Sequence, residues 1–352
     1  MSTNAGYAET WNSASTKGRG NAVLSILSYF VRDVICSPAR FLRVLWRMST
    51  NFRMQFRVFP LLKIGVIARF VCSNPRFLFK YLPPHYLARD LPTSTRTACF
   101  LHHYRSLHRA LPDSLMRRVF HGDIVLFQMR KGDNLFEITM GRSRHIEQSR
   151  HVDHEGELSL NMLVDGAHVF ILSFTIVPGW VVESHSPEVL MITRIQGGLS
   201  VFPQIQLVSK AMRGIPPEMA LIAVLEGVGK AFGIGEMAGV SAIRHICYCE
   251  SDDAIFKKAY DEFFTRIGAT RNPVNFFVGT FPRPEKPLSE LKRGQKTRAR
   301  ARRALKTQMI VDTQVNLGRP SLAEAFASPF VGDVDETESP DLVSEAEMVS
   351  QS

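Results

Sequence analysis

The feature that most constrains this chain is a series of short segments with alternating polar and apolar residues, between positions 123 and 197. A period of two is typical of strands that bury one face. We expect five strands, at 123–128, 135–140, 157–163, 167–176 and 189–195. Asp165 and Gly166 lie between the third and the fourth, and this dipeptide favours a two-residue hairpin turn. Such short connections predict an antiparallel meander.

The pattern changes after position 200, where longer apolar segments begin. Residues 202–212 fit a short helix, and residues 219–232 are almost all apolar, which predicts a buried helix. A strand at 236–243, a helix at 254–267 and a strand at 274–281 follow. This order predicts an α+β fold: a mixed, mostly antiparallel sheet with flanking helices and one β-α-β crossover. It resembles the GNAT-like acyltransferase architecture, in which two adjacent strands splay apart and a helix N-terminus receives the pyrophosphate of an acyl-CoA.

Charge is distributed unevenly along the chain. The formal net charge is +10, from 43 lysines and arginines and 33 acids. Seven of those acids lie from 333 onwards, where there is no base, so the rest of the chain is more basic than the total. We expect a disordered arm at 1–20, a basic amphipathic helical segment at 21–100, an α+β domain at 101–310 and a disordered acidic tail at 311–352. A basic body favours an anionic membrane surface or a phosphorylated ligand as partner, ahead of nucleic acid.

Residues 21–80 combine ten bases with many aromatic side chains and contain one acid. Within them, Phe41, Leu45 and Met48 have the spacing of one helical face. Three interpretations are open. These helices pack on the main domain with their arginines in solvent, bind a membrane interface by inserting apolar side chains while cations meet anionic lipid, or bind RNA or DNA. The apolar run 22–31 is shorter than the about 20 residues that a spanning helix requires.

Cysteine and histidine positions bear on the compartment and on metals. The five cysteines are odd in number and scattered, which is not a disulfide framework. We therefore expect reduced thiols and a cytoplasmic protein, with a peripheral position on the inner membrane as the second option. His102 and His103 are adjacent and cannot share one helix face, and no acid lies nearby, so no metal site is expected.

A candidate cofactor turn precedes the apolar helix. GNAT-like proteins bind acyl-CoA at a glycine-rich turn whose backbone N–H groups have no intrahelical partner. Here Gly214 is the central glycine, Lys210 and Arg213 add charge, and a proline stands where a glycine or alanine is usual. Gln196 and Gly197 end the fifth predicted strand and either let a ligand approach closely or form a plain turn. The expected ligand is acetyl-CoA or another acyl-CoA, and the alternative is a plain proline-initiated helix.

Three residues are candidates for acid–base catalysis: Glu157, His245 and Tyr260. Glu155 and Glu157 would face the same side of a strand, and one carboxyl of such a pair can have a raised pKa; solvated rim positions are the alternative. His245 follows a predicted strand, and strand ends often line clefts; a structural histidine with satisfied hydrogen bonds is the alternative. GNAT-like enzymes carry a tyrosine four residues before the glycine that ends the next helix, where this chain has Phe264. Tyr260, one turn earlier on the same face, is the substitute.

A basic stripe is the last candidate site. Residues 286–306 contain nine bases and one acid. On a helix, Lys292, Lys296, Arg300 and Arg303 form one stripe that can bind phosphates of RNA, lipid or a nucleotide. No aromatic side chain lies between them to stack on bases, and a solvated basic helix is the simpler interpretation.

Several stretches match one family in order: 103–105, 155–161, 195–198, 209–216, 239–245, 260–268 and 286–292. Together they span residues 103–309 and resemble the VirK/YbjX-like family of Gram-negative bacteria. The resemblance implies a role in virulence-factor expression or in adaptation of the cell envelope to stress, and it implies no particular biochemical activity. Two hypotheses follow: an N- or O-acyltransferase with a GNAT-like, acyl-CoA-binding domain, or a non-enzymatic protein that binds RNA or anionic lipid.

Overall fold

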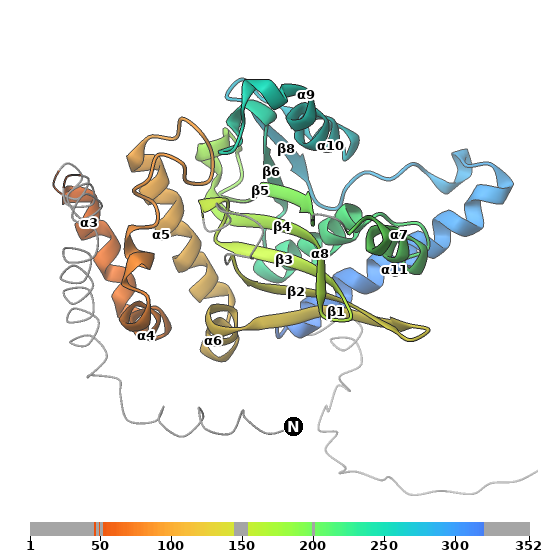
Figure 1. Cartoon of the computed structure of the whole chain (residues 1–352), viewed down its shortest axis with the longest axis horizontal. Helices are drawn as coiled ribbons and strands as arrows, with labels where there is room; N and C mark the ends of the chain where they lie inside the picture. Colours follow the sequence, from red (N-terminus) through yellow and green to blue (C-terminus); the bar gives the residue numbers. More distant parts are fainter. Residues whose placement is uncertain (1–45, 47–48, 50–51, 144–153, 199–200, 320–352) are drawn as a thin grey trace, which may run out of the picture. The chain divides into compact units, whose positions relative to one another are not determined.

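The computed structural model describes residues 46, 49, 52–143, 154–198 and 201–319 (Figure 1). The expected arm at 1–20 and the acidic residues from 333 onwards lie outside these ranges. The helical spacing of Phe41, Leu45 and Met48 lies outside them as well.

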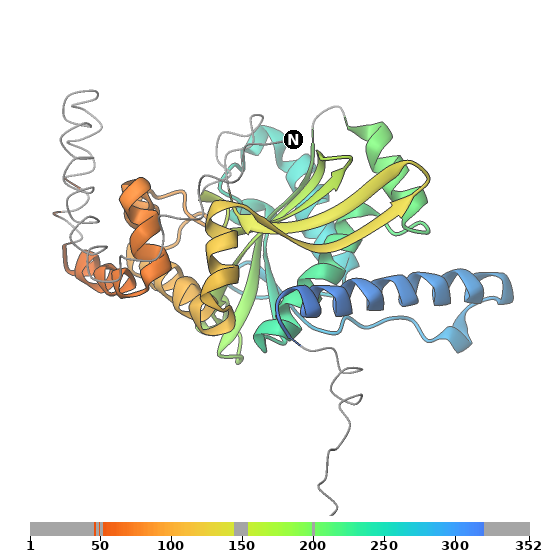
Figure 2. The same cartoon turned by 90° about the horizontal axis from the view of Figure 1, so that it is seen from below.

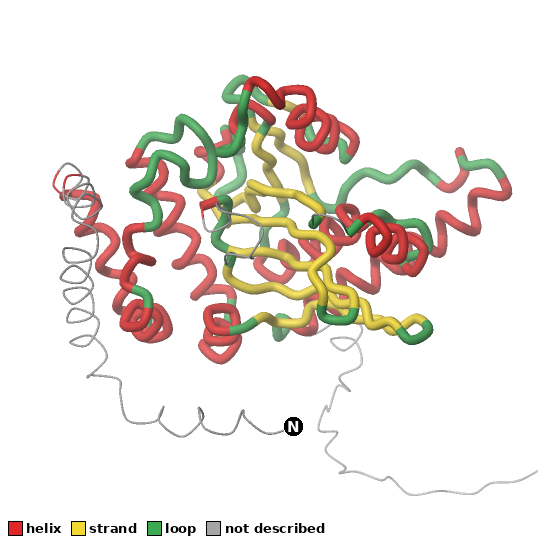
Figure 3. Tube along the Cα trace, in the orientation of Figure 1, coloured by secondary structure: helices red, strands yellow, loops and turns green. Residues whose placement is uncertain are grey.

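The described strands form a single eight-stranded sheet in the order β1-β2-β3-β4-β5-β6-β8-β7 (Figure 3). The strands are β1 (Asp123–Lys131), β2 (Asn134–Arg142), β3 (Leu158–Val164), β4 (Ala167–Pro178), β5 (Glu188–Gly197), β6 (Glu236–Val240), β7 (Thr270–Arg271) and β8 (Phe276–Thr280). All neighbouring strands are antiparallel except β5 and β6. The predicted α+β class and the mixed, mostly antiparallel sheet are confirmed.

The five-strand meander follows the alternation in the sequence closely. The turn between β3 and β4 lies at Asp165 and Gly166, which both have positive φ (50° and 81°), as a type I′ hairpin requires. The Asp165 carboxylate also accepts a hydrogen bond from the backbone N–H of Leu135, at 2.8 Å, which ties this turn to β2. Local turn chemistry therefore sets the register of this part of the sheet.

Helices flank the sheet (Figures 1 and 2). They are α3 (Phe52–Val58), α4 (Gly65–Ser73), α5 (Thr93–Ala110), α6 (Asp113–His121), α7 (Phe202–Ala211), α8 (Pro217–Phe232), α9 (Asp253–Phe256), α10 (Glu262–Arg266) and α11 (Arg293–Asn316). The apolar α8 packs on β3, β4 and β5, and α11 packs on α8 and β1. α5 packs on β4, and α6 packs on β1 and β2.

The β-α-β crossover runs from β5 through α8 to the parallel strand β6. On β6, Gly239 lies against the ring of Phe264 in α10: a Cβ built at this glycine would be 2.2 Å from ring atoms. A larger residue would push α10 away from the sheet. The predicted strand 236–243 ends earlier, at Val240, because the chain turns into a short 3-10 helix at Ala242–Arg244. The predicted helix 254–267 is divided, and a π-helical turn at Lys257–Asp261 separates α9 from α10.

One hydrophobic core extends through the described residues, from Val58 near α3 to Leu317 after α11. The expected boundary between residues 100 and 101 falls inside α5, and the boundary at 310 falls inside α11, which continues to Asn316. The described N-terminal helices are therefore part of the same packed body as the sheet. Composition marked them as different because they are basic, whereas packing depends on their buried faces.

Candidate functional site

The parallel strands β5 and β6 separate at their carboxyl ends. Three residue pairs keep them in register, and the last is Ile192 opposite Gly239. Just beyond, β5 contains a bulge at Thr193, which has no partner in the β4 register, and β6 ends at Val240. Bulges are common beside active sites, and ligands of open sheets bind at the carboxyl ends of parallel strands. Side chains at the carboxyl ends of β5 and β6 are therefore candidates for a binding or catalytic site.

His245 and Tyr260 meet at this end of the sheet. The Tyr260 hydroxyl oxygen lies 2.8 Å from His245 Nε2, and both residues are buried. The other ring nitrogen, Nδ1, accepts a hydrogen bond from the backbone N–H of Cys247 at 3.2 Å. The backbone N–H of Ile195, on β5 beyond the bulge, donates to the Tyr260 oxygen. Two of the three predicted catalytic residues are thus in contact.

These contacts determine which group can donate a proton. Burial, helped by the positive charge of Arg194, lowers the pKa of His245 to about 3, so the ring is neutral near pH 7. Since Nδ1 accepts from Cys247, the single ring proton is on Nε2 and points at the Tyr260 oxygen. That oxygen accepts two hydrogen bonds, so its own O–H is available to donate. Burial and the nearby Glu155 carboxylate raise the pKa of Tyr260 well above its usual value, which keeps the proton in place.

A buried ion pair lies beside these two residues. Arg194 Nη1 is 3.0 Å from Glu155 Oε2, and both side chains are almost fully buried. Arg194 Nη2 also donates to Gln196 Oε1 at 3.0 Å, and the Cys247 thiol lies 3.4 Å from Glu155 Oε1. Partial burial and this carboxylate raise the pKa of Cys247, so it stays a thiol at neutral pH. We name this group the β5–β6 cluster: Glu155, Arg194, His245, Cys247 and Tyr260.

The β5–β6 cluster is not fully satisfied by protein groups. Arg194 Nε and Ser241 Oγ are buried and have no hydrogen-bond partner among the described residues. Most buried polar atoms in proteins have a partner, so unpaired atoms of this kind point to places where a ligand or water bonds. Gln196 and Cys247 are exposed at the rim, so the cluster reaches the surface.

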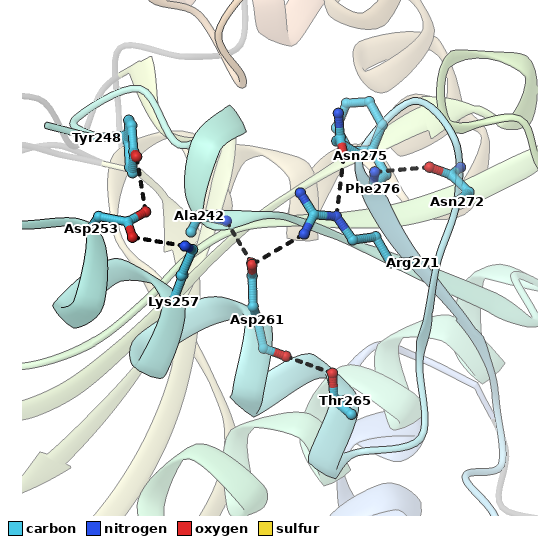
Figure 4. Close-up of polar contacts among 10 residues, drawn as sticks. All are labelled: Ala242, Tyr248, Asp253, Lys257, Asp261, Thr265, Arg271, Asn272, Asn275 and Phe276. Atoms are coloured by element: carbon cyan, nitrogen blue, oxygen red, sulfur yellow. Dashed lines mark hydrogen bonds and ion pairs between the residues drawn. The ribbon is translucent and has the colours of Figure 1, made fainter. Parts of the chain in front are cut away.

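Asp261 holds the elements that carry the cluster (Figure 4). Its Oδ1 accepts the backbone N–H of Ala242 at 2.7 Å, and its Oδ2 is 3.4 Å from Arg271 Nη1. The short helix before His245 is thereby attached to the π-helical turn that contains Tyr260. π-turns are rare and frequent at functional sites. Here the turn separates Tyr260, which reaches His245, from Phe264, which packs on β6.

The same view shows two further supports of this region (Figure 4). Asp253 accepts a hydrogen bond from the Tyr248 hydroxyl at 2.9 Å and pairs with Lys257 at 2.8 Å. Arg271 donates to the side chain of Asn275 at 3.2 Å. The contacts of Asp253 connect the loop after His245 to α9. The contact of Arg271 connects β7 to the turn before β8.

Glu157, the third predicted catalytic residue, lies in a different group. Its carboxylate is fully buried and pairs with Lys80 Nζ at 3.1 Å. The Tyr86 hydroxyl donates to it at 2.6 Å, and the Tyr104 hydroxyl donates to it as well. We name these four residues the Glu157 cluster. The expectation that Glu155 and Glu157 are either a catalytic pair or solvated rim residues does not agree with this arrangement, since both are buried with separate partners.

The turn predicted to bind acyl-CoA uses its own backbone donors. The N–H of Gly214 donates to a carbonyl of α7 at 2.7 Å, and the N–H of Ile215 donates within the turn at 3.0 Å. Pro216 and Pro217 have no N–H. Four of the positions expected to form a backbone phosphate cradle therefore offer no free donor, because Gly214 and Ile215 are already paired and the two prolines have no N–H.

Cationic side chains from other elements contact this turn. Arg302 of α11 lies over Gly214 and donates through Nε to the Arg213 carbonyl at 3.0 Å. On the other side, Lys131 Nζ lies 3.3 Å from the carbonyl of Lys210. Gly214 and Arg213 both have positive φ (79° and 57°), a conformation that costs energy for arginine. The cofactor turn and the basic helix, separate in the sequence, thus form one positively charged surface.

Gly197 has a packing role in the structure. A Cβ there would lie 3.2 Å from Ile205 of α7 and 3.3 Å from Phe170 of β4. Its neighbour Gln196 contacts Arg194, as described above. Of the five predicted cofactor-binding residues, Gln196 therefore adjoins the β5–β6 cluster, and the other four do not contact it in the described structure.

The basic stripe is divided between paired and unpaired cations. Arg303 pairs with Glu285 at 2.5 Å and is half-buried. Lys292 and Arg300 are exposed and Lys296 is half-exposed, and these three have no carboxylate partner among the described residues. The part of α11 that can meet an anion is therefore its first half.

Histidines near α5 have structural partners. His103 Nδ1 accepts the backbone N–H of Ile176 at 3.1 Å, and His102 Nε2 lies 3.0 Å from Glu188. Within the described ranges, no three histidine, cysteine or acidic side chains are grouped as metal ligands would be. No helix in the described part of the chain combines the length and apolar character needed to cross a bilayer.

Residues 39–315 match the family described as Protein of unknown function (DUF535), which includes the VirK/YbjX proteins. The match covers well over half of the chain, so the protein belongs to this family. No curated protein matches it, and no solved structure matches it.

Sequence reasoning missed Arg194 and Asp261 as functional residues and noted Glu155 only as the partner of Glu157. One signal was present. Arg194 interrupts the otherwise apolar segment 189–195, and a charge in a buried strand needs a partner. Asp261 had no such signal, because its role depends on contacts with residues 19 and 10 positions away.

Proposed function

We propose that this protein is an acyltransferase of GNAT-like architecture and that the β5–β6 cluster is its reaction centre. The observation that carries the proposal is the contact between Tyr260 and His245 at the point where the parallel strands β5 and β6 lose register. The strand order agrees with this architecture, with a meander, a crossover helix, a parallel strand and a final hairpin. The family resemblance suggests that the activity serves envelope adaptation or virulence-factor expression.

Tyr260 is the general acid in this proposal. An amine or hydroxyl of the acceptor forms a bond to the thioester carbonyl carbon, and the carbon–sulfur bond breaks. Tyr260 gives its hydroxyl proton to the departing sulfur, and His245, donating through Nε2, stabilises the tyrosine oxygen that remains. Glu155 is the carboxylate of the cluster, and it takes the proton that the acceptor loses. One proton leaves the acceptor and one reaches the thiol, so the reaction balances.

The phosphates of an acyl-CoA would be bound by side chains. Lys131 and Arg302 bond to backbone carbonyls of this turn, and Lys210 and Arg213 belong to it, so four cations gather here. Lysine and arginine bind phosphates through charge and hydrogen bonds without a free helix N-terminus. This surface replaces the backbone cradle that the sequence led us to expect.

Thermal unfolding of the full chain with a panel of acyl-CoA thioesters tests the proposal. A ligand at about 100 times its Kd adds about 2.7 kcal/mol, which should raise Tm by roughly 4 °C for a protein of this size. Lys210→Gln combined with Arg213→Gln should abolish the shift. Arg293→Gln with Arg298→Gln, on the exposed first half of α11, is the matched control and should retain it. A cooperative protein that responds to no thioester would contradict the proposal.

A second candidate function is non-enzymatic binding of RNA or anionic lipid. The exposed, unpaired cations on the first half of α11 favour it. Retention of RNA that falls steeply with salt, in a protein without any thioester response, would support this function over acyl transfer.

A further inference from the structure

Three phenylalanines form an exposed aromatic face at the N-terminal end of the described body. Phe52 and Phe56 of α3 and Phe59 just after it are spaced four and three residues apart, so they share one side. They are 61%, 57% and 41% exposed, and their rings touch edge to face with centroids 4.7 and 6.2 Å apart. We name them the aromatic face. Contiguous exposed aromatic surface is unusual on a soluble protein and marks a contact site.

The opposite side of α3 is already used. Gln55 and Val58 are buried, and α3 packs on α5. The helix is therefore held in the body by one side and presents the aromatic face to the outside. Among the described residues, the three phenylalanines of the aromatic face take no part in the core.

Cations surround the aromatic face. Arg53, Arg57 and Lys63 are exposed, and the sequence contains no acidic residue between positions 34 and 89. In the described structure none of these three cations pairs with a carboxylate. Aromatic and basic side chains on one helix surface are the composition of segments that bind an anionic bilayer interface.

A basic groove opens next to the aromatic face. It has a volume of about 530 Å³, and its walls include Arg57, Pro60, Leu101, His102, Arg105 and Pro178. Arg57 comes from α3 and Arg105 from α5, so two helices each contribute a guanidinium. Glu188 contacts this wall through His102, and it is also bonded to Ser106 and Arg109. Trp180, two residues after Pro178, is 59% exposed.

We propose that this surface docks the protein on an anionic phospholipid bilayer. The aromatic face inserts at the level of the acyl chain boundary, and the groove between Arg57 and Arg105 holds a phosphate of an anionic headgroup. The positive charge of this surface favours an anionic bilayer over other partners. A second copy of this basic chain would bring like charges together, and a neutral protein partner would leave Arg57 and Arg105 without anions. The inference is independent of the acyl transfer proposed above.

Flotation of the full chain with vesicles tests the insertion. Vesicles of phosphatidylcholine alone are compared with vesicles that also contain phosphatidylglycerol. The triple variant Phe52→Ser, Phe56→Ser, Phe59→Ser should weaken binding to the anionic vesicles by about tenfold or more, since the inserted apolar area is lost. Phe202→Ser with Ile255→Ser removes comparably exposed apolar residues elsewhere and is the control. It should bind as the parent protein does.

A second pair of variants tests the groove. Arg57→Gln with Arg105→Gln should weaken binding to anionic vesicles by roughly 30-fold, because each cation at an anionic surface contributes about fivefold. Arg293→Gln with Arg298→Gln removes two exposed cations of α11 and should change binding much less. All four sets of substitutions are at exposed positions, so Tm should stay close to that of the parent and loss of folding can be separated from loss of binding.

Three results would overturn the inference. Equal binding to neutral and anionic vesicles would remove the role of the groove. An equal loss in the α11 variant would mean that total charge, not this surface, attracts the bilayer. Loss of RNA retention in the aromatic variant, with vesicle binding unchanged, would assign the surface to nucleic acid. The response to acyl-CoA in solution reports on the turn around Gly214 and on the β5–β6 cluster, not on the aromatic face, so the two proposals can fail independently.

Discussion

Glu155 and Glu157 are two residues apart, both buried, and yet they belong to two different kinds of polar cluster. Glu157 accepts from Lys80, Tyr86 and Tyr104, which all lie N-terminal to the sheet. Glu155 faces Arg194 and Cys247, in a group where Arg194 Nε has no hydrogen-bond partner among the described residues. A fully satisfied buried network fixes one packing arrangement, whereas a partly satisfied one retains capacity to bind.

We infer that the two clusters have different roles, although both contain a glutamate from the same short stretch of chain. The Glu157 cluster connects α5 and the preceding loop to the sheet, so it should contribute mainly to stability. The β5–β6 cluster lies where two strands lose register, so it should contribute mainly to function.

Tyr260→Phe should reduce acyl transfer by about 10²–10⁴-fold, because the proton donor is removed while the ring remains. Release of free thiol from an acyl-CoA measures this. Tyr248→Phe removes a hydroxyl from the neighbouring loop that donates no proton in the reaction. Its activity should stay within about twofold of the parent value, because no general acid is lost. Equal losses in both variants would mean that the loop as a whole, and not the Tyr260 hydroxyl, matters.

Glu157→Ala should lower the free energy of unfolding by about 3–5 kcal/mol, since it leaves the buried Lys80 charge without its partner. Denaturant unfolding measures this loss. Activity per folded molecule should stay near the parent value. Glu290→Ala, at an exposed ion pair, should change stability by less than about 1 kcal/mol. A stable but inactive Glu157→Ala protein would reverse the proposed division.

Asp261→Ala should cost about 1–3 kcal/mol, because the N–H of Ala242 loses its acceptor. Activity should also fall, since Tyr260 and His245 would no longer be held together. Asp261→Asn keeps an oxygen for that N–H and should recover most of the stability. Asp252→Ala, an exposed acid nearby, serves as the control, and an equal effect there would show that Asp261 has no special role.

His245 should make the protein sensitive to acid. Its pKa is about 3 in the folded state and about 6.5 when unfolded, so between these values only the unfolded chain is protonated. Stability is full above about pH 6.5 and falls by about 1.4 kcal/mol per pH unit as the pH drops toward 3. His103, whose pKa burial also lowers, adds an effect of the same sign. His245→Gln should reduce the slope of stability against pH, and an unchanged slope would argue that His245 is not buried in its neutral form.

Much of the fold could be predicted from local patterns. The alternation between 123 and 197 predicted five strands, and each is present with ends within a few residues. The apolar run 219–232 predicted α8. These elements depend on periodicity and turn chemistry, which neighbouring residues express directly. β7 was missed because its two residues pair only through contact with β8.

The candidate site was predictable only in part. His245 was proposed from its place after a strand and Tyr260 from its place on a helix, and the structure brings the two residues into contact. The burial of both glutamates was not predicted, because polar residues at a strand start usually meet solvent. The pairing of the Gly214 turn with Arg302 could not be predicted either, since 88 residues separate them.

By itself, the sequence determined the α+β class, the meander and the basic character of the chain, because hydrophobic periodicity, turn residues and charge are local properties. The tertiary structure alone decided which charges are neutralised and which polar atoms lack partners. It set Glu157 against two tyrosines and a lysine, and it set Glu155 beside the Tyr260 and His245 pair. A residue's neighbours in space determine its dielectric surroundings and its pKa, and those neighbours come from elements far apart along the chain.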